Sequence, residues 1–127
     1  MSWPLIAAIA LGGALGSVGR YAMSSTVGHA VGTAFPWGTL AVNVLGGFAI
    51  GALAELFALR WSASPEMRAF LITGILGGFT TFSAFSLELL AMAARGAWAP
   101  AAAYIVASVA LSLLAAAAGL ALIRAVA

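Results

Sequence analysis

The sequence predicts an all-α membrane protein with four transmembrane helices, the third of them broken. The chain has 127 residues, of which 65% are hydrophobic and 6% charged, and its mean hydropathy is +1.16. These values exclude a soluble globular domain and are typical of an integral membrane protein. One crossing takes about 20 residues, so four helices and short loops use the whole length. We expect one transmembrane domain over residues 1–127, with spans at about 4–23, 37–59, 70–94 and 98–125.

The few charged residues exclude several classes of function. The net charge is +2, and the pI of about 10.0 reflects how few groups titrate. It does not indicate a basic nucleic-acid surface, so we expect no nucleic-acid partner. The absence of cysteine excludes a disulfide or a thiolate metal site, and a single histidine excludes a histidine metal cluster within one subunit.

The first span begins without a basic residue ahead of its apolar run, which favours a retained helix over a cleaved signal peptide. Gly12 and Gly16 are four residues apart and would let another helix approach closely. Arg20 is the only charge in this span and is followed by Tyr21. Two interpretations of Arg20 stay open: an arginine that reaches the lipid headgroups, or a cation at the mouth of an anion path.

Residues 24–36 contain two glycines and a proline, which predicts a loop in which His29 is solvated. The second span then begins at Trp37 and carries Asn43 well inside the membrane. A buried amide must find partners, and it either joins two helices or offers its N–H donors to an acceptor-only ligand. Gly47 and Gly51 again permit close helix packing.

The third span contains the stretch around which the chain is organised, residues 77–86. Two glycines followed by two threonines form helix poorly, so the helix is predicted to break here. Freed backbone groups at this depth must face protein or a wet cavity. Four hydroxyls follow, together with Phe82 and Phe85 on one helix face. The alternative is a packing seam whose hydroxyls bond back to the preceding turn. Glu88 is either functional or a carboxylate near the headgroups.

The fourth span places Tyr104, Ser108 and Ser112 at intervals of four residues, so their hydroxyls lie on one stripe of the helix. Packing of the surrounding alanines explains part of this pattern. A continuous row of hydrogen-bond donors is nevertheless a suitable wall for a narrow polar path.

Loop charges bear on orientation. With four crossings, Arg60, Arg68 and Arg124 lie on the side of the termini, and Arg20 and Arg95 on the other. Three against two gives almost no positive-inside bias, so the chain could insert both ways. If both orientations coexist, the natural dimer is antiparallel, with its two-fold axis in the membrane plane.

Three motifs along nearly the whole chain carry a resemblance to a known family. They are Gly12-Gly13 with Gly16 and Arg20-Tyr21, Gly38-Thr39-Leu40-Ala41-Val42-Asn43-Val44-Leu45-Gly46, and Gly77-Gly78-Phe79-Thr80-Thr81-Phe82-Ser83. The chain resembles the fluoride-exporter family of bacterial membrane proteins, the Fluc or CrcB fluoride channels. The resemblance implies a multi-pass, fluoride-selective ion channel of the bacterial inner membrane. Such a channel exports fluoride passively and so relieves its toxicity.

The resemblance also implies an antiparallel, dual-topology homodimer in lipid, with two fluoride pores and one central structural sodium ion. Main-chain carbonyls of Gly77 and Thr80 match the sodium ligands, and a side chain at Gly77 would crowd the helix crossing and the dimer axis. Ala84 stands where the family commonly has Thr or Ser, so one hydroxyl of the usual track is missing. The residues that match the fluoride pore are Arg20, Thr39, Asn43, Phe82, Ser83, Phe85, Tyr104, Ser108 and Ser112.

The chemistry of these residues agrees with that resemblance. Fluoride only accepts hydrogen bonds, so a dry pore must supply donors, which amides and hydroxyls do. Phenylalanine edges carry the positive part of the ring quadrupole and can face an anion. Carbonyls freed at a helix break carry partial negative charge and suit a cation.

Two other classes remain as alternatives. A small dual-topology multidrug or cation antiporter also has four short spans, but that family relies on a carboxylate in the first span, which is absent here. An intramembrane serine hydrolase would need its base beside the nucleophile, whereas His29 is expected in a loop. No Gly-x-Ser-x-Gly motif occurs, and we expect no enzymatic activity.

Overall fold

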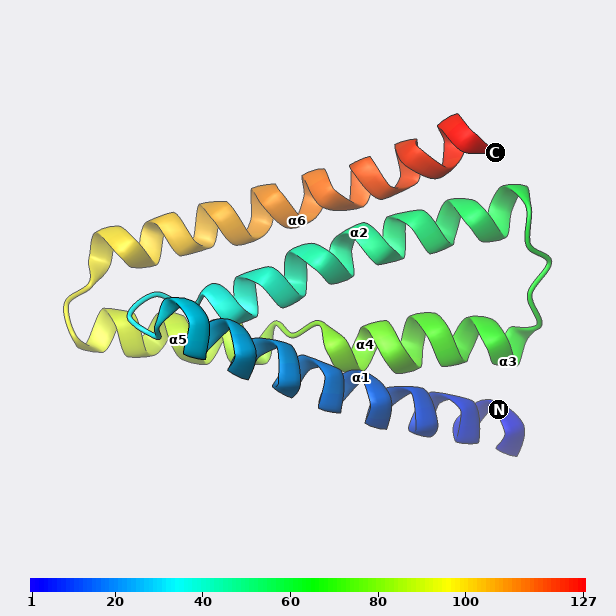
Figure 1. The fold of residues 1–127 in the computed structure, drawn as a ribbon. Coiled ribbons are helices and arrows are strands. Elements are labelled where there is room, and N and C mark those ends of the chain that lie inside the picture. The colour runs from blue at the N-terminus through cyan, green and yellow to red at the C-terminus, as the bar shows by residue number, and fades with distance from the viewer.

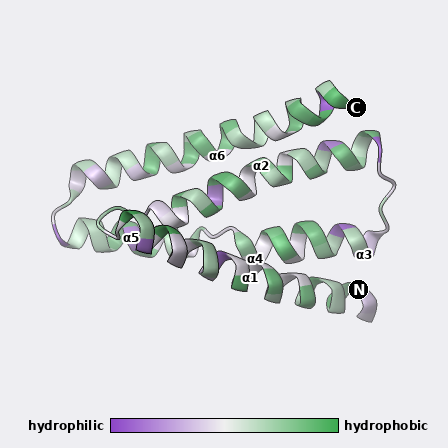
Figure 2. Ribbon diagram, viewed as in Figure 1, coloured by the Kyte–Doolittle hydropathy of each residue, from purple (hydrophilic) through white to green (hydrophobic).

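The computed structural model describes residues 1–127 and is entirely helical (Figure 1). Four of its helices are long and apolar enough to cross a membrane. Hydrophobic residues follow one another along the length of all four spans (Figure 2). The predicted class, an all-α membrane protein with four spans and a broken third helix, is confirmed. The spans are α1 (Trp3–Val31), α2 (Trp37–Leu59), the composite third span (Pro65–Ala94) and α6 (Trp98–Val126).

The helix ends have local causes. Ser2 caps α1 by accepting a hydrogen bond from the Leu5 N–H at 3.4 Å, and Ser64 caps the third span by accepting from the Met67 N–H at 3.2 Å. A proline stands in the first turn of both helices, where no donor is lost. Gly32 and Gly96 have φ values of 88° and 76°, which suit glycine, and they lie in the turns that follow α1 and α5.

The predicted loop over residues 24–36 is wrong in its extent. Helix α1 continues to Val31, and only residues 32–36 connect it to α2. His29 therefore lies in the last turn of α1, where its Nδ1 is 2.7 Å from the Ser25 carbonyl oxygen. One glycine costs a helix about 1 kcal/mol, which is less than the loss of several backbone hydrogen bonds in lipid. The helix therefore tolerates Gly28 and ends at Gly32.

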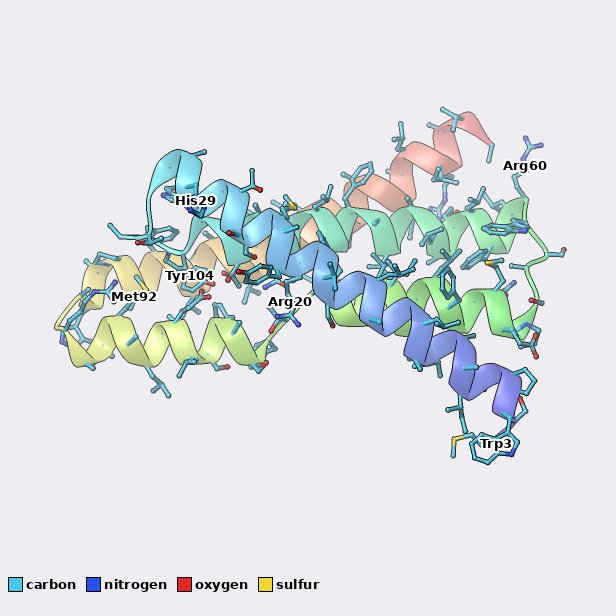
Figure 3. All side chains as sticks on the ribbon, turned by 60° about the horizontal axis from the view of Figure 1, so that its bottom comes forward. Trp3, Arg20, His29, Arg60, Met92 and Tyr104 are labelled. Atoms are coloured by element: carbon cyan, nitrogen blue, oxygen red, sulfur yellow. The ribbon has the colours of Figure 1, made fainter.

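The longer α1 moves Arg20 away from the membrane surface. Arg20 lies eleven residues before Val31, roughly 16 Å along the helix. Figure 3 shows Arg20 in the middle of the bundle, far from Trp3 at one end. The side with the termini keeps Arg60, Arg68 and Arg124, and the opposite side keeps Arg95 alone. The expected charge balance of three against two is therefore three against one.

The third span consists of four helical pieces. It begins as α3 (Pro65–Arg68), continues as a π-helix, η1 (Ala69–Leu76), and ends its first half in α4 (Gly77–Phe79). The second half is α5 (Ser83–Ala94). The predicted break is present at residues 80–82, one residue after the two glycines, which are themselves helical. In Figure 1 this break appears as the thin segment between α4 and α5 near the middle of the bundle.

Glycines bring the helix backbones together in two pairs. A Cβ atom on Gly12 or Gly16 of α1 would collide with backbone oxygens of η1. A Cβ atom on Gly47 would lie 2.7 Å from the Ser112 carbonyl oxygen of α6, and one on Gly51 would collide with another carbonyl of that helix. Both expected small-residue contacts are confirmed. The hydrophobic core lies between α2, α5 and α6 and consists of Leu40, Phe85, Met92, Ala101 and Tyr104.

Candidate functional site

The break interrupts the hydrogen-bond ladder of the third span. Thr80 has extended backbone angles, with φ −80° and ψ 156°. In a continuous helix the N–H of Thr81 would donate to the Gly77 carbonyl, and that of Phe82 to the Gly78 carbonyl. Neither bond is present, and the Thr81 N–H instead donates to Asn43 Oδ1 at 2.8 Å. Side chains of other helices therefore replace the lost bonds.

Asn43 of α2 binds both backbone polar groups of one residue of the break, Thr81. Its Oδ1 accepts from the Thr81 N–H, and its Nδ2 donates to the Thr81 carbonyl at 2.9 Å. The two interpretations of Asn43 are both compatible with this contact. It joins α2 to the third span, and the second hydrogen of Nδ2 remains for another acceptor.

Hydroxyls beside the break bond back to nearby backbone. Thr80 Oγ1 donates to the Leu76 carbonyl at 2.9 Å, and Ser86 Oγ to the Phe82 carbonyl at 2.9 Å. Thr81 Oγ1 accepts from the Ala84 N–H at 3.1 Å and lies 3.2 Å from Ser83 Oγ. The alternative interpretation, in which the hydroxyls of this stretch bond back to nearby backbone, therefore describes these side chains.

Two carbonyl oxygens of the break keep their acceptor capacity. No residue of the break donates to the Gly77 oxygen, and nothing in the chain donates to the Thr80 oxygen. These are the two oxygens that the family resemblance implies as sodium ligands. Unpaired carbonyl dipoles are suitable ligands for a hard cation, so the residues present fit a sodium ion.

A cavity of about 450 Å³ lies beside the break, between α2 and α6. Seven residues of the predicted pore and sodium site line it: Asn43, Gly77, Thr80, Phe82, Phe85, Ser108 and Ser112. The Oγ atoms of Ser108 and Ser112 are buried and have no hydrogen-bond partner in the chain. Buried hydroxyls are rarely left without a partner, so these two point to a ligand or water.

The phenylalanine pair is brought together as the spacing predicted. The ring centroids of Phe82 and Phe85 are 5.3 Å apart. Phe85 is buried and meets the Tyr104 ring in an edge-on arrangement at 4.9 Å, whereas Phe82 is 77% exposed. One ring is thus fixed by the core, and the other is free to contact a membrane or another subunit.

Glu88 joins two of the predicted pore residues, and sequence reasoning had left its role open. Its Oε2 accepts from the Tyr104 hydroxyl at 2.7 Å, and its Oε1 accepts from Thr39 Oγ1 at 2.6 Å. Thr39 and Tyr104 therefore lie at this carboxylate and do not line the large cavity. A second cavity of about 260 Å³, toward the α1–α2 connection, is lined by Thr39 and Glu88. The sequence signal that could have indicated a role for Glu88 beside the pore residues is its spacing: it lies three residues after Phe85, on the same helix face.

Arg20 and the two glycines lie on the other side of the break. Arg20 Nε donates to the Gly78 carbonyl at 3.0 Å. A Cβ atom on Gly78 would lie 2.6 Å from the Gly13 carbonyl oxygen of α1, whereas one on Gly77 would meet nothing closer than 3.6 Å. The expectation that Gly77 keeps the helix crossing clear is therefore wrong within one subunit. Gly78 has that role, because its side faces α1.

Comparisons with known proteins agree with the three motifs. The family model described as CrcB-like protein, Camphor Resistance (CrcB), matches residues 7–120. A relative from Rhizobium meliloti, named fluoride-specific ion channel FluC, is 59% identical over 117 residues, which are 92% of this chain and 94% of the relative.

Two further relatives carry the same name. The protein from Rhodospirillum centenum is 55% identical over 120 residues, which are 94% of this chain and 95% of the relative. The protein from Nitrobacter winogradskyi is 51% identical over 124 residues, which are 98% of both chains. On the family match and these identities, the chain belongs to the CrcB-like protein family.

Proposed function

We propose that this chain forms a fluoride-selective ion channel that lets fluoride leave the cell passively. The relatives that match nearly its whole length are named as fluoride-specific channels. The observation that carries the proposal is the pair of buried hydroxyls, Ser108 Oγ and Ser112 Oγ, which belong to residues that line the cavity beside the break and have no hydrogen-bond partner in the chain.

The lining of the cavity suits a small anion. Fluoride accepts hydrogen bonds and donates none, so hydroxyl and amide donors stabilise it after it loses its water. Asn43 keeps one N–H free after binding Thr81, and Phe82 and Phe85 can present their positive ring edges. Each of these partners is weak, which lets an ion enter and also leave.

We further propose that two copies form an antiparallel homodimer around one structural sodium ion. The unpaired oxygens of Gly77 and Thr80 support this arrangement. Each subunit would supply two of them, and a two-fold axis would bring four together. Four carbonyls are few for sodium, so the ion would be buried and structural. It would hold the two broken helices together.

Liposome flux tests the proposed function. Purified protein should release fluoride rapidly, and chloride hardly at all, from vesicles followed with ion-selective electrodes. Ser108→Ala and Ser112→Ala should slow fluoride release without loss of folding, since neither hydroxyl has a partner in the chain. Thr26→Val is the matched control, because that hydroxyl bonds only to the Ala22 carbonyl. Equal release of both anions by the unaltered protein would overturn the proposal.

A further inference from the structure

Arg20 extends the glycine seam between α1 and the third span. Gly12, Gly16 and Arg20 are spaced by four residues, so they lie on one stripe of α1. The two glycines allow the backbones of α1 and η1 to touch, and Gly78 allows the same one turn further along the third span. These close backbone contacts, at Gly12 to Ser17 of α1, lie just before Arg20 and bring it against the break.

Arg20 supplies a hydrogen-bond donor to a backbone carbonyl that has lost its donor at the break. The Gly78 carbonyl loses its helical donor, the Phe82 N–H, because the chain turns away at Thr80. Arg20 Nε donates to that carbonyl at 3.0 Å. A charged donor makes a stronger hydrogen bond than a neutral one. This contact also gives a partner to an arginine that is costly inside a membrane.

We propose that Arg20 is a positioning residue that caps the broken third helix through Gly78. On the other side of the break Asn43 hydrogen-bonds to the Thr81 backbone. Side chains of α1 and α2 thus bind neighbouring backbone groups of the break. The hydrogen bonds from Arg20 and Asn43 pair the Gly78 and Thr81 carbonyl oxygens, whereas the Gly77 and Thr80 oxygens stay unpaired. Arg20 thus determines which carbonyls are presented to a cation. This inference rests on the proposed sodium site.

The chemistry of three substitutions separates this role from attraction of anions by charge. Glutamine carries its amide nitrogen at the same position along the side chain as Nε of arginine, so Arg20→Gln keeps the donor and removes the charge. Lysine has a methylene at that position, so Arg20→Lys keeps the charge and removes the donor there. Arg20→Met removes both and keeps an unbranched chain as far as the position of Nε.

Sodium titration of thermal stability is the decisive measurement, made on purified full-length protein in detergent. For the unaltered protein and Arg20→Gln, the sodium concentration for half-maximal stabilisation should agree within about threefold. For Arg20→Lys and Arg20→Met it should rise by roughly tenfold or more, as expected for loss of a charge-assisted hydrogen bond. If Arg20→Met does not fold, the comparison of Gln with Lys carries the test.

Other outcomes would overturn the inference. If Arg20→Lys behaves like the unaltered protein while Arg20→Gln is weakened, charge is what matters. Equal behaviour of all variants, or equal weakening of all three, would show that a donor at the Nε position does not hold the break. Fluoride flux is measured separately on the same proteins, so failure of the channel proposal is distinguished from failure of this one.

Discussion

Replacement of Asn43 by aspartate isolates one hydrogen bond of the break. The two side chains have the same shape, so packing is unchanged. The oxygen that accepts from the Thr81 N–H at 2.8 Å is kept, but the Nδ2 that donates to the Thr81 carbonyl at 2.9 Å becomes a second oxygen. Two acceptors then face each other with no proton between them at neutral pH.

The size of the effect follows from that mismatch. Leaving a buried acceptor without its donor costs about 1–3 kcal/mol. At about 1.4 kcal/mol per factor of ten, the equilibrium constant for the intact break falls by roughly 5- to 150-fold. Fluoride release by Asn43→Asp should fall by up to that factor. An ionised carboxylate at the cavity would also repel the anion, which acts in the same direction.

The assay is fluoride efflux from liposomes at neutral pH, with folding checked by gel filtration. Ser86→Ala is the control, because the Phe82 carbonyl that Ser86 Oγ contacts also accepts from the Ser86 N–H. A lower pH restores a proton to the new carboxyl and hence a donor toward Thr81. Activity of Asn43→Asp relative to the unaltered protein should therefore rise as pH falls, after subtraction of leakage through protein-free vesicles. Unaltered flux at neutral pH in a folded Asn43→Asp protein would refute the reasoning.

Four further outcomes are expected. Phe82→Ile or Phe85→Ile should cut fluoride efflux severely while the protein stays folded, because the ring edges are lost and bulk is kept; unchanged flux in both would return these rings to ordinary packing. Gly78→Ala should lower the thermal midpoint far more than Gly77→Ala, since only the former meets backbone at 2.6 Å; equal midpoints would contradict the seam. Prolonged dialysis into sodium-free buffer should weaken the dimer or its flux by mass action, as read by gel filtration and efflux. Cross-linking from each face of the membrane should detect antiparallel pairs, and a parallel dimer alone would exclude the proposed arrangement.

Several features of this protein are local properties of its sequence. Hydropathy summed over each span set the class and the number of crossings, because a bilayer accepts only long apolar helices. The glycines and threonines of residues 77–81 located the break, since each weakens a helix where it stands. The four-residue spacing of Tyr104, Ser108 and Ser112 put three hydroxyls on one stripe of α6.

The end of α1 could not be found from local signals. Residues 24–31 look like a loop because of their glycine, serine and threonine content, yet they are helical. In water such a segment could unwind and bond to solvent, but in lipid the helical bonds are retained. This one difference places Arg20 in the middle of the bundle and changes the charge count on which the orientation argument rested.

The partners at the break were decided by tertiary structure alone. Arg20 meets Gly78 across 58 residues of sequence, and Asn43 meets Thr81 across 38. Spacing along a helix shows which side chains share a face, but it does not show which face meets which neighbour. That depends on how closely the backbones approach, which the glycine contacts of α1 with η1 and of α2 with α6 determine. For the same reason Glu88 became the partner of Thr39 and Tyr104 only when α2, α5 and α6 packed together.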